Sequence, residues 1–496
     1  MPEQPEEHRL IAERRRKLAE LRKLGVEPYP YEYDQTHHAA ELQTLHAHLP
    51  EQGRSGEMVR VAGRLMLFRD MGKLAFGQVQ DETGRIQVML RKETLGGSWG
   101  VVELLDLGDF IGARGEVIKT KTGEVTVEAN EIALLSKSVR PLPDKHKGLK
   151  DEETRLRKRY LDLIMNPDVK EVFRKRSLII DATRGVLAKR RFLEVETPTL
   201  QTVYGGANAK PFLTHINAWD LRMYLSISPE LYLKRLLVGG FERVYTICKN
   251  FRNEGVDQMH NPEFTMMECY AAHWDYRRMM ALTEEIYEEA CKAVNNSTRV
   301  ERNGVTLEFK APWPRIRFLD SIREHAGVDV ESMDRDALMR EAVERNLDVA
   351  PQATRGEILM AFFERYAEEK LIQPCHVIDH PIESTPLCKT LRTGDLAMIE
   401  RFESFAVGVE LSNAYSELND PARQKELFAQ QEERGRGGDE EAHPMDADYV
   451  EALEYGMPPA GGLGIGIDRM VILLTGAEGI RDVILFPTVK PGNEDG

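Results

Sequence analysis

Two glutamates, Glu403 and Glu410, are of the right chemical type to bind a divalent cation. Carboxylate oxygens are hard ligands, and Mg²⁺ prefers such ligands. The two residues lie seven positions apart in a segment with a strand-like pattern, and in a regular strand this spacing points them to opposite faces unless a bulge intervenes. The spacing alone therefore predicts no metal site.

Glycine-rich signatures of the common nucleotide-binding enzymes are missing from the chain. No G-x-x-x-x-G-K-[ST] phosphate loop occurs, and Gly462, Gly464 and Gly466 follow a G-x-G-x-G spacing that differs from the dinucleotide fingerprint. These observations disfavour a kinase and a Rossmann enzyme.

Four segments carry a specific resemblance to one family. The longest, FRNEGVDQMHNPEFTMMECY at 251–270, resembles motif 2 of class II aminoacyl-tRNA synthetases in the form typical of the lysine enzyme. The others are FLEVETPTL (192–200, motif 1, with Pro198), LSNAYSELNDP (411–421, the amino-acid pocket segment) and GLGIGIDR (462–469, motif 3). The resemblance runs from about Val59 to Pro491 in the family's order, so the chain resembles the bacterial class II lysyl-tRNA synthetases.

This resemblance implies activation of L-lysine by ATP to lysyl-adenylate and transfer to the 3′-terminal adenosine of tRNA(Lys). Adenylation brings a carboxylate and a phosphate together, so positioning and charge neutralisation carry most of the catalysis. By resemblance, the bidentate guanidinium of Arg252 holds the lysine carboxylate and the α-phosphate, and Arg469 holds the γ-phosphate of a bent ATP. These two arginines are the predicted catalytic residues.

Further contacts to ATP follow from the same resemblance. Phe264 stacks under the adenine, Glu254 accepts from its amino group, and His260 and Asn261 lie by the nucleotide tail. The family's magnesium ligands correspond to Glu403 and Glu410, so several Mg²⁺ ions in each site are expected. The predicted ATP-binding residues are Arg252, Glu254, His260, Asn261, Phe264, Glu410, Leu411, Gly466, Asp468 and Arg469.

The amino-acid pocket can be argued from the charges of lysine. Lysine carries two ammonium groups, so the resemblance assigns Glu230 to the α-amino end and Glu417 with Tyr270 to the ε-amino end. An aspartate pocket would need basic residues there, because buried acids that face a carboxylate are strongly unfavourable. The predicted lysine-binding residues are Gly206, Glu230, Arg252, Glu268, Tyr270, Asn413, Tyr415 and Glu417.

Two positions depart from the pattern of some bacterial members of the family. Met259 replaces a basic residue just before His260, so a side-chain contact to the terminal phosphates is not expected there. Tyr415 stands where phenylalanine is frequent, which makes the pocket wall more polar. Neither change removes a catalytic group.

An N-terminal barrel is predicted from short alternating runs between Val59 and about Leu135. Tight turns at 82–84 and 121–123 separate some of these runs, and five such strands favour a small closed barrel of the OB type. By resemblance, this barrel reads the anticodon of the tRNA.

Within this barrel, four residues match the family's anticodon-binding positions: Arg69, Phe76, Gln87 and Glu131. An exposed aromatic ring stacks on a base while amide and guanidinium groups bond its edge, and uridine is the expected target. Strand alternation does not tell which face Phe76 occupies. A core phenylalanine with a solvated glutamine therefore stays open as an alternative.

Beyond residue 140 the pattern changes to longer helices mixed with strands. A helix is expected over 173–191, strands over 223–227, 244–250 and 263–270, and a glycine-rich strand over 461–467 that leads into a helix. We expect an α+β protein, with an OB-fold barrel followed by a class II catalytic domain whose antiparallel sheet is flanked by helices. The predicted domains are 1–58 (basic helix and connector), 59–139 (OB-fold anticodon-binding domain), 140–160 (linker) and 161–496 (catalytic domain with motifs 1, 2 and 3).

The basic cluster between Ile11 and Leu24 predicts an amphipathic helix, with apolar residues at helical spacing. Two interpretations stay open. The helix either docks through its apolar stripe with its charges solvated, or its basic face contacts the RNA backbone.

Composition places the chain among cytoplasmic globular proteins. No run of 18 apolar residues and no secretory signal are visible, so no membrane association is expected. The five cysteines lie far apart with no C-x-x-C pair, which argues against a zinc ribbon and a disulfide framework. The net charge of −15 would disfavour nucleic acid only if binding followed totals rather than local patches.

Motif 1 builds a two-fold interface in the family, so a homodimer is expected. Three other functions remain as alternatives. One is an enzyme that attaches lysine to a protein, whose relatives lack the barrel, and another is a related synthetase for aspartate or asparagine. The third is a catalytically inactive RNA-binding paralogue, which should have lost Arg252, Arg469 or the magnesium glutamates.

Overall fold

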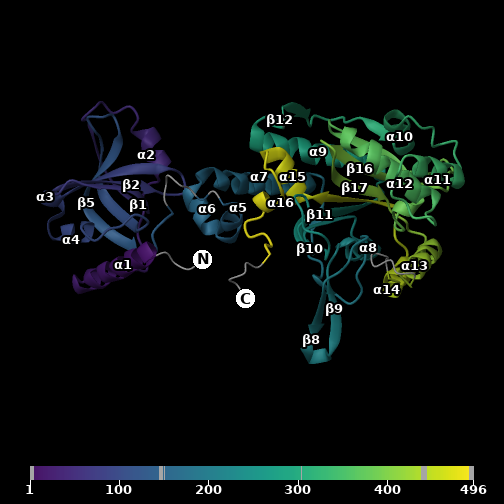
Figure 1. The fold of residues 1–496 in the computed structure, drawn as a ribbon, viewed down its shortest axis with the longest axis horizontal. Coiled ribbons are helices and arrows are strands. Elements are labelled where there is room, and N and C mark those ends of the chain that lie inside the picture. The colour runs from purple at the N-terminus through teal and green to yellow at the C-terminus, as the bar shows by residue number, and fades with distance from the viewer. Residues whose placement is uncertain (1–4, 144–148, 150, 303, 437–443, 491–496) are drawn as a thin grey trace. The chain divides into compact units, whose positions relative to one another are not determined.

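The computed structural model describes residues 5–143, 149, 151–302, 304–436 and 444–490 (Figure 1). It divides into two compact units, one spanning Met1–Lys150 and the other Asp151–Lys490. The predicted linker at 140–160 spans this division; its residues 144–148 and 150 lie outside the described ones. Among the described residues, no helix combines the length and the apolar character needed to cross a bilayer.

The first unit is a closed barrel of five strands in the order β1-β2-β3-β5-β4. Only the β3–β5 pair is parallel. Its elements are α1 (Pro5–Lys23), α2 (Ala39–Leu45), β1 (Arg54–Asp70), β2 (Leu74–Gln80), β3 (Arg85–Arg91), α3 (Lys92–Leu95), η1 (Gly96–Ser98), α4 (Trp99–Val102), β4 (Phe110–Lys119) and β5 (Val125–Ser136). Both predicted tight turns join neighbouring strands, and the predicted OB-type barrel is confirmed.

Helix α1 docks on this barrel through more than its apolar stripe. Ile11 and Leu21 are buried, as the pattern predicts. Arg14 donates to three backbone carbonyl oxygens of the barrel unit, and the Nζ of Lys17 lies 2.7 Å from Oδ1 of Asp106. Part of the basic cluster therefore fixes the helix in place and is not available to RNA.

The second unit contains the remaining elements of the chain. Its helices are α5 (Glu152–Arg157), α6 (Arg159–Met165), α7 (Pro167–Lys189), η2 (Asn217–Trp219), α8 (Glu230–Val238), α9 (Tyr276–Asn295), α10 (Phe318–Ala326), α11 (Arg335–Glu344), α12 (Arg355–Tyr366), η3 (Glu368–Lys370), η4 (Ile382–Ser384), α13 (Pro421–Arg436), α14 (Ala447–Glu454), α15 (Ile467–Thr475) and α16 (Ile480–Val483). Its strands are β6 (Leu193–Glu194), β7 (Leu200–Gln201), β8 (Leu213–Ile216), β9 (Leu221–Leu225), β10 (Arg243–Phe251), β11 (Glu263–Ala272), β12 (Arg299–Arg302), β13 (Val305–Glu308), β14 (Arg315–Arg317), β15 (Cys375–Pro381), β16 (Met398–Ala406), β17 (Val409–Ser416) and β18 (Ala460–Gly466).

Within the described residues, eight of these strands form the main sheet in the order β14-β15-β16-β17-β18-β11-β10-β6. The five pairings from β15 to β10 are antiparallel, and parallel pairing occurs only where β14 and β6 join at the two edges. The predicted antiparallel sheet with flanking helices is therefore confirmed. The helix expected over 173–191 is α7, which begins six residues earlier, with Pro167 in its first turn.

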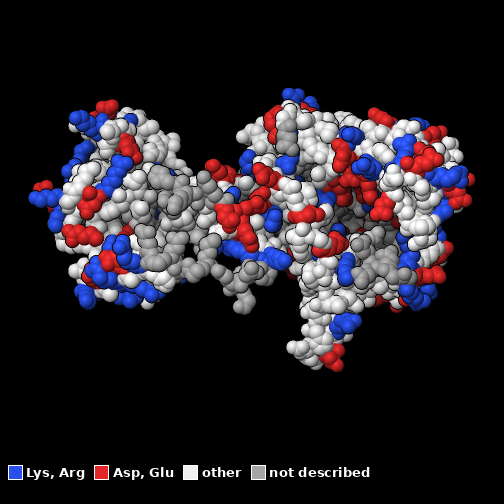
Figure 2. Space-filling model, viewed as in Figure 1, with Lys and Arg blue, Asp and Glu red and all other residues white. Residues whose placement is uncertain are grey.

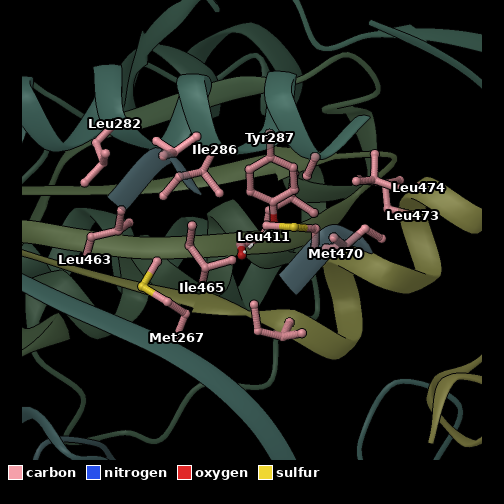
Figure 3. Close-up of a cluster of buried hydrophobic side chains, with 14 of the residues drawn as sticks. Met267, Leu282, Ile286, Tyr287, Leu411, Leu463, Ile465, Met470, Leu473 and Leu474 are labelled. Atoms are coloured by element: carbon pink, nitrogen blue, oxygen red, sulfur yellow. Dashed lines mark hydrogen bonds between the residues drawn. The ribbon is translucent and has the colours of Figure 1, made fainter. Parts of the chain in front are cut away.

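Alternation along the central strands separates the core from the opposite face of the sheet. Met267 of β11 and Leu463 and Ile465 of β18 pack under α7, α9 and α15 in one apolar cluster (Figure 3). The hydroxyl of Tyr287 on α9 donates to the backbone oxygen of Leu411 on β17 at 3.1 Å. Because side chains alternate between faces, the intervening residues of these strands point to the other side of the sheet.

Candidate active site

A cavity of about 400 Å³ lies on that other face. Strand β11 lines it with alternate residues, Phe264, Met266, Glu268 and Tyr270. Strands β17 and β18 contribute Leu411, Asn413 and Tyr415, and Gly462, Gly464 and Gly466. On the face drawn in Figure 2, acidic side chains gather around a hollow in the second unit.

Nearly all residues predicted to bind ATP, lysine or magnesium line this single cavity. They are Gly206, Glu230, Arg252, Glu254, His260, Asn261, Phe264, Glu268, Tyr270, Glu403, Glu410, Leu411, Asn413, Tyr415, Gly466, Asp468 and Arg469. The exception is Glu417, whose carboxylate lies directly behind the wall. Segments far apart in the sequence are thus brought together as one site.

Arg252 begins the loop between β10 and β11 and points its guanidinium into the cavity. Its backbone N–H donates to the carbonyl oxygen of Pro262 at 2.9 Å, which closes the base of the loop. Its Cζ lies 5.1 Å from the centroid of the Phe264 ring. The buried Nε makes no hydrogen bond with any described residue, and burial lowers the pKa of the guanidinium. A buried donor without a partner is suited to an anionic ligand.

Arg469, in the first turn of α15, faces the same space. Its Nη1 donates at 3.0 Å to both the backbone oxygen and Oε2 of Glu410, and its Nη2 lies 3.3 Å from Nε2 of His260. The other ring nitrogen of His260 lies 2.8 Å from Oδ2 of Asp257, and Oδ1 of Asp257 accepts from the backbone N–H groups of Met259 and His260. Since arginine only donates, Nε2 of His260 acts as acceptor and Nδ1 carries the proton.

Asp468 lines the cavity, but its carboxylate is engaged by the protein. Oδ1 accepts from Nη1 of Arg176 on α7 at 2.6 Å, and Oδ2 accepts from the backbone N–H of Thr265 at 2.6 Å. This buried group therefore ties the start of α15 to α7 and β11. In this arrangement it fixes the start of α15, which carries Arg469, and presents no free carboxylate to a nucleotide.

Glu403 and Glu410 do not lie on one strand, so the expectation of a single strand-like segment is wrong. Glu403 is on β16 and Glu410 on β17, and a tight turn at Val407 and Gly408 joins them. A register irregularity between Ser404 and Phe405 accompanies the hairpin. Both glutamates line the cavity because the chain reverses between them.

The two carboxylates fit a magnesium site that the protein completes only in part. Among the described residues, no group of three or more His, Cys, Asp or Glu side chains could hold a metal ion. Oε1 of Glu403 lies 2.5 Å from Nη2 of Arg401, and Oε2 of Glu410 lies 3.0 Å from Arg469. Two oxygen ligands suit ions that take their other ligands from phosphates and water.

At the far end of the cavity, Glu268 is buried and has two hydroxyl partners. Its Oε1 accepts from the hydroxyl of Ser228 at 2.8 Å and its Oε2 from the hydroxyl of Tyr270 at 3.1 Å. Burial, reinforced by the charge of Glu230, raises the pKa of this carboxyl to about 8. Glu268 is therefore largely protonated at pH 7 when no ligand is present, and a nearby cation would favour its ionised form.

A buried lysine, Lys234, lies between the other two acids of this end. Its Nζ is 2.5 Å from Oε1 of Glu230, one turn earlier on α8, and also forms an ion pair with Oε2 of Glu417. The hydroxyl of Tyr415 donates to the same Oε1 of Glu230 at 2.6 Å. Oε1 of Glu417 is buried and accepts no hydrogen bond from a described residue.

Glycines make room for this arrangement. A Cβ on Gly462 would lie 1.9 Å from Oε1 of Glu417 and 2.4 Å from the Tyr270 ring, so only glycine fits between them and the cavity. Gly206 has a φ of +87° and would place a Cβ 2.7 Å from the hydroxyl of Ser228. The G-x-G-x-G spacing thus belongs to a strand that forms the cavity floor, not to a phosphate loop.

Sequence reasoning missed three residues of this site: Lys234, Ser228 and Arg401. Arg401 lines the cavity, and its Nε donates to Oδ1 of Asn413 at 3.0 Å. Each of these residues orients a predicted site residue, and each partner is distant in sequence or hidden within an apolar helix pattern. Only Ser228 and Lys234 gave a local signal, since they flank Glu230 in the segment SPELYLK.

On the barrel, the predicted anticodon residues lie on the outer surface. Phe76 lies between the buried Ala75 and Gly77 and is only partly buried, and it pairs across the sheet with Arg69. Gln87 is on β3; its Nε2 donates to Glu124 at 2.6 Å. Glu131 is placed elsewhere by register, opposite Arg114 of β4, with which it forms an ion pair. Arg69, Phe76 and Gln87 therefore lie on the neighbouring strands β1, β2 and β3, and Glu131 lies apart from them on β5.

Comparison with known protein families agrees with this geometry. A family model described as tRNA synthetases class II (D, K and N) matches residues 151–490, and one described as OB-fold nucleic acid binding domain matches residues 59–135. The chain belongs to the class II tRNA synthetases. The first match covers the whole cavity, and the second covers most of the barrel strands.

Curated members of this synthetase family match nearly the full chain. The lysine–tRNA ligase of Pelotomaculum thermopropionicum is 51% identical over 97% of this chain and 95% of its own length. The lysine–tRNA ligase of Clostridium novyi is 49% identical over 97% of this chain and 94% of its own length. The lysine–tRNA ligase of Xanthomonas oryzae pv. oryzae is 48% identical over 99% of this chain and 98% of its own length.

Proposed function

We propose that this chain is a lysine–tRNA ligase, which activates L-lysine with ATP and transfers it to tRNA(Lys). The observation that carries this proposal is the charge at the inner end of the cavity. Three buried carboxylates, Glu230, Glu268 and Glu417, face a single buried ammonium, that of Lys234. When all three are ionised, the end of the cavity lacks two positive charges, and lysine brings two ammonium groups.

Aspartate and asparagine do not match this charge. Each would bring one ammonium group, and aspartate would also bring its side-chain carboxylate into a space already rich in acids. Leaving buried carboxylates unpaired costs several kcal/mol. The acidic cavity end therefore disfavours these two substrates of the same family.

The outer end of the cavity supports the activation step. Arg252 offers its unpartnered guanidinium donors where the substrate carboxylate and the α-phosphate would meet, and Arg469 and His260 line the space beyond. Held donors of this kind stabilise charge that develops during transfer without reorganising. The substrate carboxylate is already ionised at pH 7, so this step needs no protein general base.

We assign magnesium to Glu403 and Glu410, whose carboxylates line the cavity beside Arg401 and Arg469. Magnesium supplies neutralisation of the triphosphate charge when it is bound. Before magnesium binds, Arg401 and Arg469 orient the two carboxylates and reduce their mutual repulsion.

Exposed leucines on α7 and on the motif 1 segment 192–200 favour a homodimer. Leu178 on α7, Leu193 on β6 and Leu200 on β7 are each between 45% and 50% exposed. A contiguous apolar patch on a surface marks an interaction site, and we propose these leucines as part of such a patch. We also place the enzyme in the cytoplasm, where its five cysteines, all free thiols, stay reduced.

The alternatives are less well supported by the site. An inactive paralogue would not keep Arg252, Arg469, Glu403 and Glu410 on one cavity. An enzyme that modifies a protein would not need the barrel, whose outer face carries the partly buried Phe76 beside Arg69.

Charging of tRNA tests the proposal. Purified tRNA(Lys), tRNA(Asp) and tRNA(Asn) are each incubated with the chain, ATP, Mg²⁺ and the labelled cognate amino acid. Lysine on tRNA(Lys) alone is the expected product. Aspartate or asparagine on its own tRNA would contradict the assignment of the pocket.

A further inference from the structure

The side chain of Lys234 is buried in α8 with no exposed surface. It does not line the cavity, and two carboxylates hold its ammonium group. A buried lysine without a role would be replaced at little loss by an apolar residue, because taking an ammonium out of water is costly. Its position behind the wall of the amino-acid pocket therefore calls for a reason.

The contacts of Lys234 follow one pattern. Its Nζ donates to Oε1 of Glu230 at 2.5 Å and forms an ion pair with Oε2 of Glu417. Each carboxylate thus gives one oxygen to Lys234 and keeps the other. Oε2 of Glu230 has no partner among the described residues, and Oε1 of Glu417 is buried without one. Glu230 lines the cavity, and Oε1 of Glu417 lies directly behind Gly462 of its wall.

The residues around Lys234 cannot replace its charge. Apart from Glu230 on its own helix, the titratable groups that face this cluster are Glu268 and Tyr270 of β11, Cys388, Tyr415 of β17, Glu417, and Tyr449 of α14. None of these is cationic. Two arginines act on their neighbours, Arg401 on Cys388 and Arg235 on Tyr449, but Arg401 is paired with Glu403, and Arg235 with Asp446 and Asp448. The rings of Tyr415 and Tyr270 lie 5.4 Å and 5.9 Å from Nζ and add a weaker attraction.

We infer that Lys234 is a positioning residue for lysine selection, which bridges the carboxylates of Glu230 and Glu417 and leaves one oxygen of each for an ammonium group of the substrate. This inference rests on the proposed function. Two close carboxylates without a cation between them share a proton, and a protonated carboxyl no longer attracts an ammonium group. Burial and the charge of Glu230 raise the pKa of Glu417 well above its usual value, and Lys234 opposes this rise. Glu230 and Glu417 in turn outweigh burial and hold the pKa of Lys234 well above its usual value.

Lys234→Met tests the inference, because methionine has a similar length and no charge. KM for lysine in pyrophosphate exchange at pH 7 should rise about 100-fold or more, as expected when one partner of a buried ion pair is removed. KM for ATP should stay the same. The matched control is Arg235→Met, which removes the neighbouring cation of α8, an arginine paired with Asp446 and Asp448 near the surface, and should change KM for lysine by about threefold at most.

A pH profile separates positioning from simple packing. In Lys234→Met the added proton must leave before lysine binds, so KM for lysine should fall steeply as pH rises from 7 to 9, and more steeply than in the unaltered enzyme. Calorimetry in buffers of different ionisation enthalpy should show more protons released per lysine bound. A packing defect would raise KM equally at every pH and release no additional proton, and that result would overturn the inference.

Lys234→Gln gives the second variant if Lys234→Met does not fold. Glutamine donates hydrogen bonds to both carboxylates without carrying a charge, so the same rise in KM and the same pH dependence are expected. Lysine binding by Lys234→Gln within about threefold of the unaltered enzyme would overturn the inference, since an uncharged donor would then suffice. If the unaltered enzyme itself does not activate lysine, the proposed function fails instead.

Discussion

At the scale of single residues, Glu268 links the site to the stability of the fold. Its carboxyl has a folded-state pKa of about 8 against an ordinary value of 4.5. The folded state therefore keeps a proton that the unfolded chain loses between these values, and stability falls as pH rises from 4.5 to 8. Glu268→Gln should make this pH-dependent loss in the free energy of unfolding smaller by up to about 4 kcal/mol, because the amide does not titrate.

Denaturant unfolding at pH 5 and pH 8 measures the difference. The unaltered protein should lose more stability between the two pH values than Glu268→Gln. Equal losses would mean that Glu268 is already ionised in the empty site, and the role of burial in raising its pKa would be wrong.

Arg252 carries the second prediction at this scale. Arg252→Ala should slow adenylate formation about 100- to 1,000-fold, because held donors to a developing charge are lost. Arg252→Lys should recover only part of the rate, since an ammonium lacks the bidentate fork. Binding of tRNA, measured by filter retention, should be nearly unchanged in both variants. Normal adenylation by Arg252→Ala would remove it from the catalytic residues.

At the scale of elements, strand β18 forms the floor of the lysine end through its alternate glycines. Gly462→Ala would place a methyl group 1.9 Å from the Glu417 carboxylate, and Gly464→Ala one 3.2 Å from the flexible end of Met266. Gly462→Ala should therefore raise KM for lysine at least about tenfold. Gly464→Ala should raise it less, and the reverse order in pyrophosphate exchange would contradict this placement of β18.

Strand alternation and turn residues predict much of the fold, but not every element. The barrel follows from its alternating runs, and β10, β11 and β18 lie within one or two residues of their expected ranges. The β16–β17 hairpin does not follow, because its turn places Val407 at a φ of +49°, and valine is rarely found in that region. An apolar pattern that continues through a turn reads as one strand.

Site residues found through motifs were easier to predict than the residues that orient them. Arg252 and Glu410 stand inside long, specific segments. Lys234 pairs with Glu417, which is 183 positions away, and Arg176 reaches Asp468 from α7, which none of the motifs includes. Such partners depend on the packing of whole elements, and local spacing carries no information on that packing.

At the scale of the whole molecule, two compact units divide the proposed labour. The barrel carries the predicted anticodon residues, and the cavity with its arginines lies in the second unit. Phe76→Ala should therefore weaken charging of tRNA(Lys), because a stacked base contributes about 1 to 3 kcal/mol. Pyrophosphate exchange by the same variant should be unchanged and serves as its internal control. Unaltered charging would return Phe76 to a purely structural role.

Amino-acid-dependent exchange of labelled pyrophosphate into ATP tests the central claim most directly. The twenty standard amino acids are offered one at a time in magnesium buffer, with no tRNA present. Our account predicts exchange with lysine alone, because only lysine supplies two ammonium groups to the acids around Lys234 and a carboxylate to Arg252. Exchange with aspartate or asparagine, or silence with all twenty from folded protein, would contradict it.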